Sequence, residues 1–197
     1  LPISTFSEQH KKLKQAAEKI VKERVVPRAA EIDATDEYPY NLRKLFAELG
    51  YFSILVPKEY GGGGSDLTSA CIVTEEIAKS SAACAQMTYA AIQACCMLLF
   101  CNEEQRRRIY PTIATGERII GFSVTEPSAG SDIGRIETTA VRRGSYYVLN
   151  GTKVFATGVG FWTSWFMMAK TDPAMGTQGL ALFLVDEDSP GLHIGHL

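Results

Sequence analysis

The chain changes character at residues 122–132, which read FSVTEPSAGSD. An apolar strand, expected over 119–125, runs here into a loop of small and hydroxyl-bearing residues. Pro127 fixes the direction of the turn, and Gly130 permits close approach of a ligand or of another backbone segment. The pattern predicts helices before this stretch and strands after it.

The residues before this stretch place apolar side chains at helical spacing between capping and helix-breaking residues. Thr5 and Glu8 form a capping-box pattern at the start of the first helix, and Pro27 should kink or end that helix. A second helix is expected with Asn41 as its N-cap and with Gly50 just past its end. These signals indicate several short helices.

Four consecutive glycines, 61–64, invite a phosphate-loop interpretation, but no Gly-Lys-Ser/Thr follows them. A turn before a helix capped by Ser65 or Asp66 is the favoured interpretation. Residues 82–100 are apolar nearly all round, so this helix should lie inside a bundle. Asn102 caps the last predicted helix.

After Gly116 the sequence predicts short strands. They are expected at 119–125, 138–142, 146–149, 152–157, 165–170, 180–185 and 192–194, with Asn150-Gly151 as a two-residue hairpin turn. Helices followed by strands indicate a segregated α+β fold, with a helical bundle and then an antiparallel β-barrel or sandwich. The expected domains are residues 1–115 and 116–197, the second of them incomplete.

Composition excludes several classes of protein. Apolar residues make up 46% and charged residues 21%, with a net charge of -2 and no basic stripe, which argues against nucleic-acid binding. Residues 82–101 are interrupted by Gln86 and Gln93, so a core helix is favoured over a membrane span. The cysteines form no C-x-x-C pair and have no histidine nearby. They are expected to be small buried residues in a reducing compartment, with no metal site: Cys71, Cys84, Cys95, Cys96 and Cys101.

The residues alone leave the chemistry of the 122–132 stretch open. Ser128, Ser131 and free backbone N–H groups could hold a phosphate or a polarised ring oxygen. An ordinary exit from a strand, with Asp132 capping the next turn, accounts for the pattern equally well. No nucleophile constellation is present. The histidines are His10, His193 and His196, and the last two are expected on strand edges.

The same stretch resembles the V-T-E-P-x-A-G-S-D signature of the acyl-CoA dehydrogenases. Residues 149–157, LNGTKVFAT, resemble that family's N-G-x-K-x-W/F-I-T/S motif, and residues 57–62, PKEYGG, resemble its P-x-E-Y-G-G turn. Residues 183–192 are similar to a further F-x-V pattern followed by glycine. Motifs in this order and at this spacing identify the chain as a member of the family over nearly its whole length.

The resemblance implies an FAD site. Its expected cofactor contacts are Phe122, Val124, Thr125, Gly130, Ser131, Phe155, Ala156 and Thr157. The backbone at Val124 and Thr125 would bind the pyrimidine end of the flavin, and Phe155 would pack against the isoalloxazine. Thr157 would offer its hydroxyl to flavin N5. Ser131 would lie near the FAD pyrophosphate and the pantetheine arm of the substrate. Ala156 departs from the isoleucine that is commoner in relatives.

The resemblance also implies α,β-dehydrogenation of acyl-CoA thioesters to trans-2-enoyl-CoA, an oxidation of a CH–CH bond. The glutamate base of the family belongs to a carboxy-terminal helical domain beyond Leu197, so no catalytic residue is assigned. Glu126 is expected to support its loop. The 197-residue chain alone should therefore be inactive, and an unpaired sheet edge should make it poorly stable.

Two alternatives share this fold, an acyl-CoA oxidase and an enoyl-CoA reductase. A non-catalytic subunit is disfavoured because Thr125, Ser131 and Thr157 are retained. The family implies an acyl-CoA substrate in fatty-acid β-oxidation, electron-transfer flavoprotein as acceptor, and a homotetramer or homodimer. No nucleic-acid partner and no stable membrane insertion are expected. The expected compartment is the bacterial cytoplasm or the mitochondrial matrix.

Overall fold

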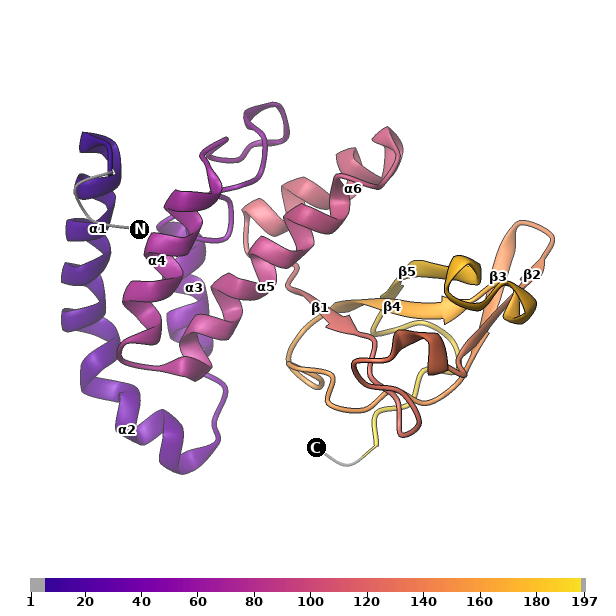
Figure 1. Ribbon diagram of the computed structural model, residues 1–197. Helices are drawn as coiled ribbons and strands as arrows, with labels where there is room; N and C mark the ends of the chain where they lie inside the picture. The colour runs from indigo at the N-terminus through magenta and orange to yellow at the C-terminus, as the bar shows by residue number, and fades with distance from the viewer. Residues whose placement is uncertain (1–5, 196–197) are drawn as a thin grey trace. The chain divides into compact units, whose positions relative to one another are not determined.

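The computed structural model describes residues 6–195, apart from the side chains of Cys96 and Met97. The chain divides into two compact units after Ile119 (Figure 1). Helices make up the first unit, and a five-stranded sheet forms the second. The predicted order of a helical region and then a β-sheet domain is confirmed.

The first helix, α1, spans Glu8–Ile20. Its N-cap is Ser7, whose Oγ accepts a hydrogen bond from the backbone N–H of His10 at 3.1 Å. The predicted cap, Thr5, lies outside the described residues. A cap at residue 5 would start the helix at residue 6. The helix instead begins at Glu8, because the Ser7 hydroxyl bonds the third helical amide.

Pro27 does not end the helical path but distorts it, as the sequence predicted. A π-helical turn, Val21–Val25, separates α1 from α2, which spans Val26–Thr35. Proline lacks an N–H and its ring clashes with the carbonyl four residues earlier. The wider turn accommodates Pro27, and the N–H of Val26 donates to the carbonyl of Val21.

Helix α3 spans Tyr40–Glu48, and its N-cap position is Pro39, so the prediction of Asn41 as N-cap is wrong. The Asn41 side chain instead accepts a hydrogen bond from Arg28 Nη1 at 2.6 Å. Gly50 follows the helix with φ of 72°, the left-handed conformation expected there.

The four glycines, 61–64, form a turn whose amides are already occupied. Gly63 N–H donates to Ser53 O at 2.8 Å, and Gly64 N–H donates to Val56 O at 2.9 Å. Amides bonded to the chain's own carbonyls are not available to a phosphate, so the structure supports the turn.

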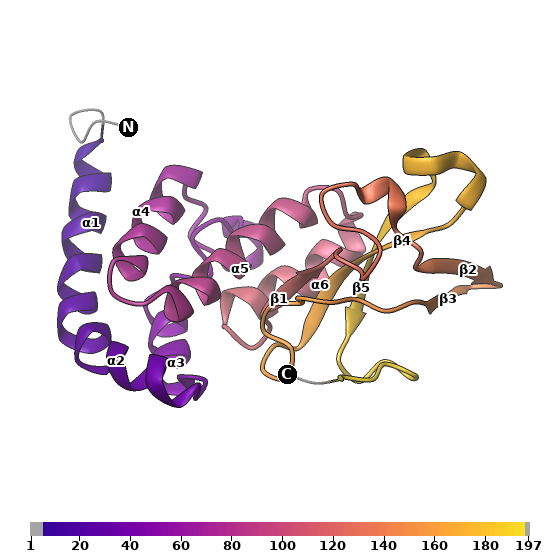
Figure 2. The same cartoon turned by 60° about the horizontal axis from the view of Figure 1, so that its bottom comes forward.

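Three longer helices complete the first unit: α4 (Leu67–Ala78), α5 (Ala82–Leu98) and α6 (Glu103–Ala114). Asp66 caps α4, and Asn102 caps α6 in a reciprocal capping box with Gln105, as predicted. Helix α4 packs between α1 and α5 (Figure 2). The largest fully buried side chains of this unit are Leu42, Phe46, Phe52, Ile77, Met87, Leu98, Ile109, Tyr110 and Ile113.

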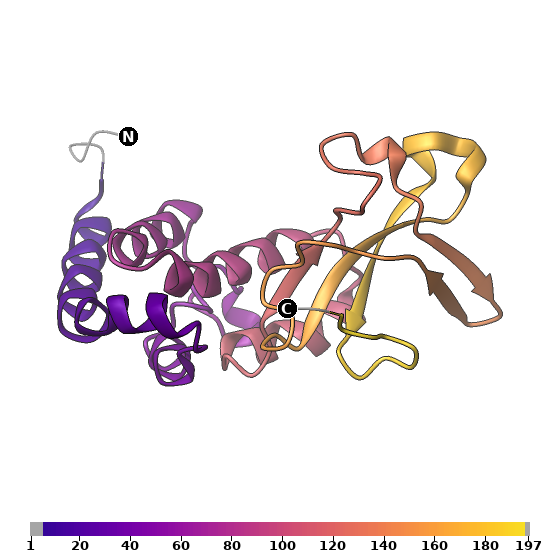
Figure 3. The ribbon, with the colours of Figure 1, turned by 90° about the horizontal axis from the view of Figure 1, so that it is seen from below.

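The second unit contains β1 (Ile120–Ser123), β2 (Thr139–Arg143), β3 (Tyr146–Asn150), β4 (Ser164–Lys170) and β5 (Leu180–Asp186). Strand β4 pairs with β1 in parallel, with β5 antiparallel, and with the start of β2 in parallel at Thr139. Strands β2 and β3 form a hairpin at one edge (Figure 3). The expectation of a wholly antiparallel sheet is therefore wrong. The sheet is mixed, because the long connection from β1 to β4 permits parallel pairing.

Two predicted strands are absent from the described part of the chain, 152–157 and 192–194. Asn150 ends β3, and the chain continues past Gly151 without a hairpin. A type I′ turn requires positive φ at both central residues, and neither has it. Gly151 serves close packing instead, because a Cβ there would lie 2.7 Å from Thr138 Cα. His193 consequently lies outside any strand, and His196 lies outside the described residues.

Exposure of the cysteines differs from the prediction. Cys84 and Cys95 are buried, but Cys101 is half-buried and Cys71 is exposed on α4, while the Cys96 side chain lies outside the described residues. Over residues 6–195, no three potential metal ligands gather in one place. In the same part of the chain, no helix combines the length and apolar character needed to cross a membrane.

Candidate functional site

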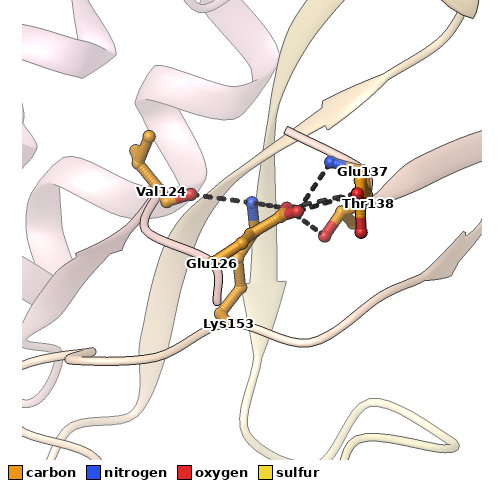
Figure 4. Close-up of polar contacts among 5 residues, drawn as sticks. All are labelled: Val124, Glu126, Glu137, Thr138 and Lys153. Carbon is orange, nitrogen blue, oxygen red and sulfur yellow. Dashed lines mark hydrogen bonds and ion pairs between the residues drawn. The ribbon is translucent and has the colours of Figure 1, made fainter. Parts of the chain in front are cut away.

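The carboxylate of Glu126 organises the loop that follows β1 (Figure 4). Its oxygens accept hydrogen bonds from Glu137 N–H at 2.6 Å, from Thr138 N–H at 3.2 Å and from the Thr138 hydroxyl. Lys153 Nζ lies 2.6 Å from Glu126 Oε1. Only 3% of the Glu126 side chain and 9% of the Lys153 side chain are exposed, so this ion pair is largely buried.

Burial on its own would raise the pKa of the Glu126 carboxyl. The hydrogen bonds from Lys153, from the Thr138 hydroxyl and from two backbone amides outweigh that effect and lower its pKa. Glu126 is therefore held as a carboxylate, with every donor around it supplied by the chain. Such a group supports structure, as the sequence predicted, and is not free to remove a proton from a substrate.

Two further bonds join this loop to the segment after β3. Lys153 Nζ donates to the carbonyl of Val124 at 3.0 Å, and Val154 N–H donates to the carbonyl of Thr125 at 2.9 Å. The two motif segments that lie far apart in sequence, 122–132 and 149–157, are thus bonded to each other. Val124 and Thr125 are both half-buried at this junction.

Phe155 directly follows this junction and is 91% exposed. Its φ is 55°, in the left-handed region that bulky residues rarely adopt. A large aromatic side chain that is both strained and fully presented to solvent is more typical of a binding surface than of a loop under no constraint. Ala156 is half-buried and Thr157 is exposed beside it.

The rest of the 122–132 stretch forms a tight loop. Glu126 and Ala129 exchange two backbone hydrogen bonds, of 2.8 and 3.1 Å. Gly130 and Ser131 are exposed, and a Cβ at Gly130 would meet nothing within 4 Å. Asp132 accepts from Gly134 N–H at 3.1 Å and so caps the following 3₁₀ turn, Ile133–Arg135. The expected cap at Asp132 is confirmed, and the ligand-binding role of Ser128 and Ser131 stays a prediction.

The structure therefore joins Val124 to Lys153 and Thr125 to Val154, and Phe155 is the next residue along the chain. Phe122 lies half-buried on β1, which leads into the site. Within the described residues, no hydrogen bond connects Ser131 or Thr157 with the other predicted site residues. Sequence reasoning gave no role to Lys153 or Thr138. The signal available for Lys153 was its fixed place in the second motif.

On the helical unit, an open groove of about 690 Å³ runs beside α3 and the end of α6. Its one partly buried guanidinium, Arg43, already donates to the carbonyls of Gly116 and Glu117 at 2.9 and 3.0 Å. None of the sequence motifs lines this groove. The β-unit loops remain the candidate site.

Both units, the helical one and the sheet whose two motif loops are bonded to each other, match models of one protein family. Residues 7–117 match the family model of the acyl-CoA dehydrogenase N-terminal domain, and residues 121–197 match that of its middle domain. The chain belongs to the acyl-CoA dehydrogenase family.

Curated relatives cover almost the entire chain. It is 36% identical to the 3-(aryl)acrylate reductase of Clostridium sporogenes, over 96% of this chain and 51% of the relative. It is also 36% identical to the cyclohex-1-ene-1-carbonyl-CoA dehydrogenase of Syntrophus aciditrophicus, over 98% and 47%. A third relative, also 36% identical, is subunit CarC of the caffeyl-CoA reductase-Etf complex of Acetobacterium woodii, over 96% and 51%. The chain spans about half the length of these relatives.

Solved structures agree with this assignment. The glutaryl-coenzyme A dehydrogenase complex with glutaryl-CoA superposes with a TM-score of 0.89 at 32% identity, over 95% of this chain and 49% of that one. The FAD complex of PigA superposes with a TM-score of 0.88 at 26% identity, over 98% and 51%.

Proposed function

We propose that this chain supplies the flavin-facing loops of an FAD-dependent enzyme that dehydrogenates acyl-CoA thioesters between the α- and β-carbons. The observation that carries the proposal is Phe155, which is held at φ of 55° and 91% exposed directly beside the bonded junction of the two motif loops. An exposed aromatic ring of this kind suits the face of a flat, largely apolar cofactor.

The residues around the junction fit a flavin. Phe155 offers its ring as a packing surface, and the exposed Thr157 hydroxyl stands two residues away in sequence. The exposed surface at Gly130 and Ser131 suits a phosphate or pantetheine group, because a Cβ at Gly130 would meet nothing within 4 Å. When bound, FAD would supply the acceptor for the hydrogen that leaves the β-carbon. The residues of this chain bind, orient and shield that ring.

The base that removes the α-proton is not part of this site. Glu126 is the carboxylate nearest to the junction, but it is buried and bonded to Lys153, Thr138 and Glu137. A general base must reach the proton that it abstracts. We infer that the base comes from outside the loops described above. The 197-residue chain alone should therefore bind FAD without dehydrogenating an acyl-CoA.

A visible absorption spectrum of the protein with FAD, before and after addition of a saturated acyl-CoA, tests the proposal. Bound flavin gives a spectrum distinct from free FAD, and bleaching on addition of the thioester reports dehydrogenation. No change in the FAD spectrum or fluorescence at any protein concentration would overturn the proposed site. Bound flavin without bleaching would support the site and place the base elsewhere.

A reductase is the second candidate, because two relatives at 36% identity are named as reductases, one of an aryl acrylate and one of caffeyl-CoA. The two reactions consume different thioesters during steady-state turnover. A dehydrogenase consumes the saturated thioester with an external electron acceptor, and a reductase consumes the 2-enoyl-CoA with an external electron donor. Consumption of a 2-enoyl-CoA with a reduced donor, and none of the saturated thioester with an oxidised acceptor, would favour the reductase. Release of peroxide in air would instead indicate an oxidase.

We further propose electron-transfer flavoprotein as the redox partner, since the name of one relative describes a complex with Etf. A homotetramer or homodimer, a role in fatty-acid β-oxidation, and a location in the bacterial cytoplasm or mitochondrial matrix complete the proposal. Light scattering after size exclusion, with and without the flavoprotein, measures both kinds of assembly.

A further inference from the structure

Lys153 makes two contacts of different kinds with one ammonium group. Its Nζ lies 2.6 Å from Glu126 Oε1 and 3.0 Å from the carbonyl oxygen of Val124 (Figure 4). With 9% of its side chain exposed, this ammonium has little competing water. The carboxylate neutralises the charge, and the remaining N–H groups can hold the carbonyl in one direction.

Fixing a carbonyl also fixes the amide beyond it. The peptide unit is planar and trans, so its C=O and its N–H point in opposite directions. Because the carbonyl of Val124 points toward the buried Nζ of Lys153, the N–H of Thr125 points away from it. The next carbonyl, that of Thr125, is fixed in turn by Val154 N–H at 2.9 Å.

This leaves one donor unused. Among residues 6–195, the N–H of Thr125 donates no hydrogen bond, although Thr125 is half-buried. Partly buried amides normally find a partner in the chain, in water or in a ligand. The amide faces away from the lysine, at the junction that is followed by the exposed ring of Phe155.

We propose that Lys153 is a positioning residue, which directs the N–H of Thr125 toward the pyrimidine edge of FAD by holding the carbonyl of Val124. The inference rests on the proposed function, since it requires FAD at these loops. Lys153 itself touches no ligand and acts through the peptide bond. A donor held in place in this way favours the negative charge of the reduced ring.

The test compares three variants of the protein by FAD fluorescence titration, by deuterium exchange of the Thr125 amide with and without FAD, and by thermal unfolding. Lys153→Met removes both contacts. The double variant Glu126→Gln/Lys153→Met removes the ion pair without leaving an unpaired buried charge, so it should recover stability. Lys170→Met is the matched control, since Lys170 Nζ donates to the carbonyl of Gly134 at 2.9 Å in the same unit.

In the wild-type protein, FAD should slow exchange at Thr125. Both variants that lack Lys153 should lose this protection and raise the FAD dissociation constant by up to about tenfold, the value of one hydrogen bond from the Thr125 amide. The Lys170→Met control should keep the wild-type constant and the protection. If the double variant regains stability but not protection, the role of Lys153 in orienting the peptide is separated from its role in the ion pair.

Two results would count against the proposal, and they differ. If the wild-type protein binds FAD but the folded double variant protects Thr125 and binds FAD as the wild type does, the positioning role is wrong and the proposed function stands. If the wild-type protein does not bind FAD at all, the proposed function fails and the inference fails with it.

Discussion

Phe155 combines two properties that a folded chain normally avoids in one residue, a positive φ and an almost fully exposed aromatic ring. The left-handed conformation costs a residue with a Cβ roughly 1–2 kcal/mol relative to the right-handed one. In the proposed site, contact of the ring with FAD would offset this cost.

Phe155→Gly should therefore stabilise the cofactor-free protein by up to about 1 kcal/mol, because glycine adopts positive φ without strain but loses more chain entropy. The same change should weaken FAD binding. Urea unfolding and FAD titration measure the two effects. Asp36→Gly, at φ of 53°, is the control. It should gain less, because aspartate tolerates this conformation, and should leave FAD binding unchanged. Weaker FAD binding in both variants would contradict the assignment.

Glu126 should make stability depend on pH. Burial alone would raise the pKa of this carboxyl in the folded protein, but the hydrogen bonds from Lys153 and Thr138 lower it by more. A carboxyl with a folded pKa below its unfolded value of about 4.3 adds stability that is complete above that value and is lost as the pH falls through the folded pKa. Wild-type protein should therefore lose more free energy of unfolding than Glu126→Gln as the pH falls from about 5 to about 2. Asp66 and Glu76 have lowered pKa values too, and remain in both proteins. Equal acid sensitivity would contradict this role.

At the scale of elements, Gly151 shows how a local signal misleads. Asn-Gly predicts a tight hairpin, yet Gly151 has no positive φ and packs against Thr138. Gly151→Ala should cost about 1–3 kcal/mol, the usual range for overpacking, because its Cβ would displace the residue that holds Glu126. Gly144→Ala is the matched control, since a Cβ there meets nothing within 4 Å and only its φ of 62° is strained. Equal unfolding free energies for the two variants would refute the packing explanation.

The elements that were predicted correctly are those whose signals act over a few residues. Asp66 and Asn102 cap helices by bonding amides three positions away, so the sequence reveals them directly. The Glu126–Lys153 pair joins residues 27 positions apart, and no local pattern predicts it. The resemblance indicated that both segments belong to one site. The structure was needed to show which atoms join them.

At the scale of the whole chain, the two units differ in how much they bury. Helices α4 and α5 contribute many buried residues to a common core, whereas both residues of the β2–β3 turn and most of β3 are exposed. Amides in α4 should therefore exchange with deuterium more slowly than those in β3, since exchange follows the free energy of local opening. Site-resolved exchange at one pH measures this. Slower exchange in β3 than in α4 would indicate that another part of the protein, or a second copy, covers the hairpin.

The division after Ile119 falls where no element crosses it, because α6 ends at Ala114 and β1 begins at Ile120. The two family models meet at nearly the same place, with one match ending at residue 117 and the other beginning at 121. Gene segments exchanged between relatives at residues 118–119 would transfer each core intact. A chimaera built at this breakpoint, with a helical half from one relative and a sheet half from another, would assign differences in acyl preference to one half or the other without cutting any helix or strand.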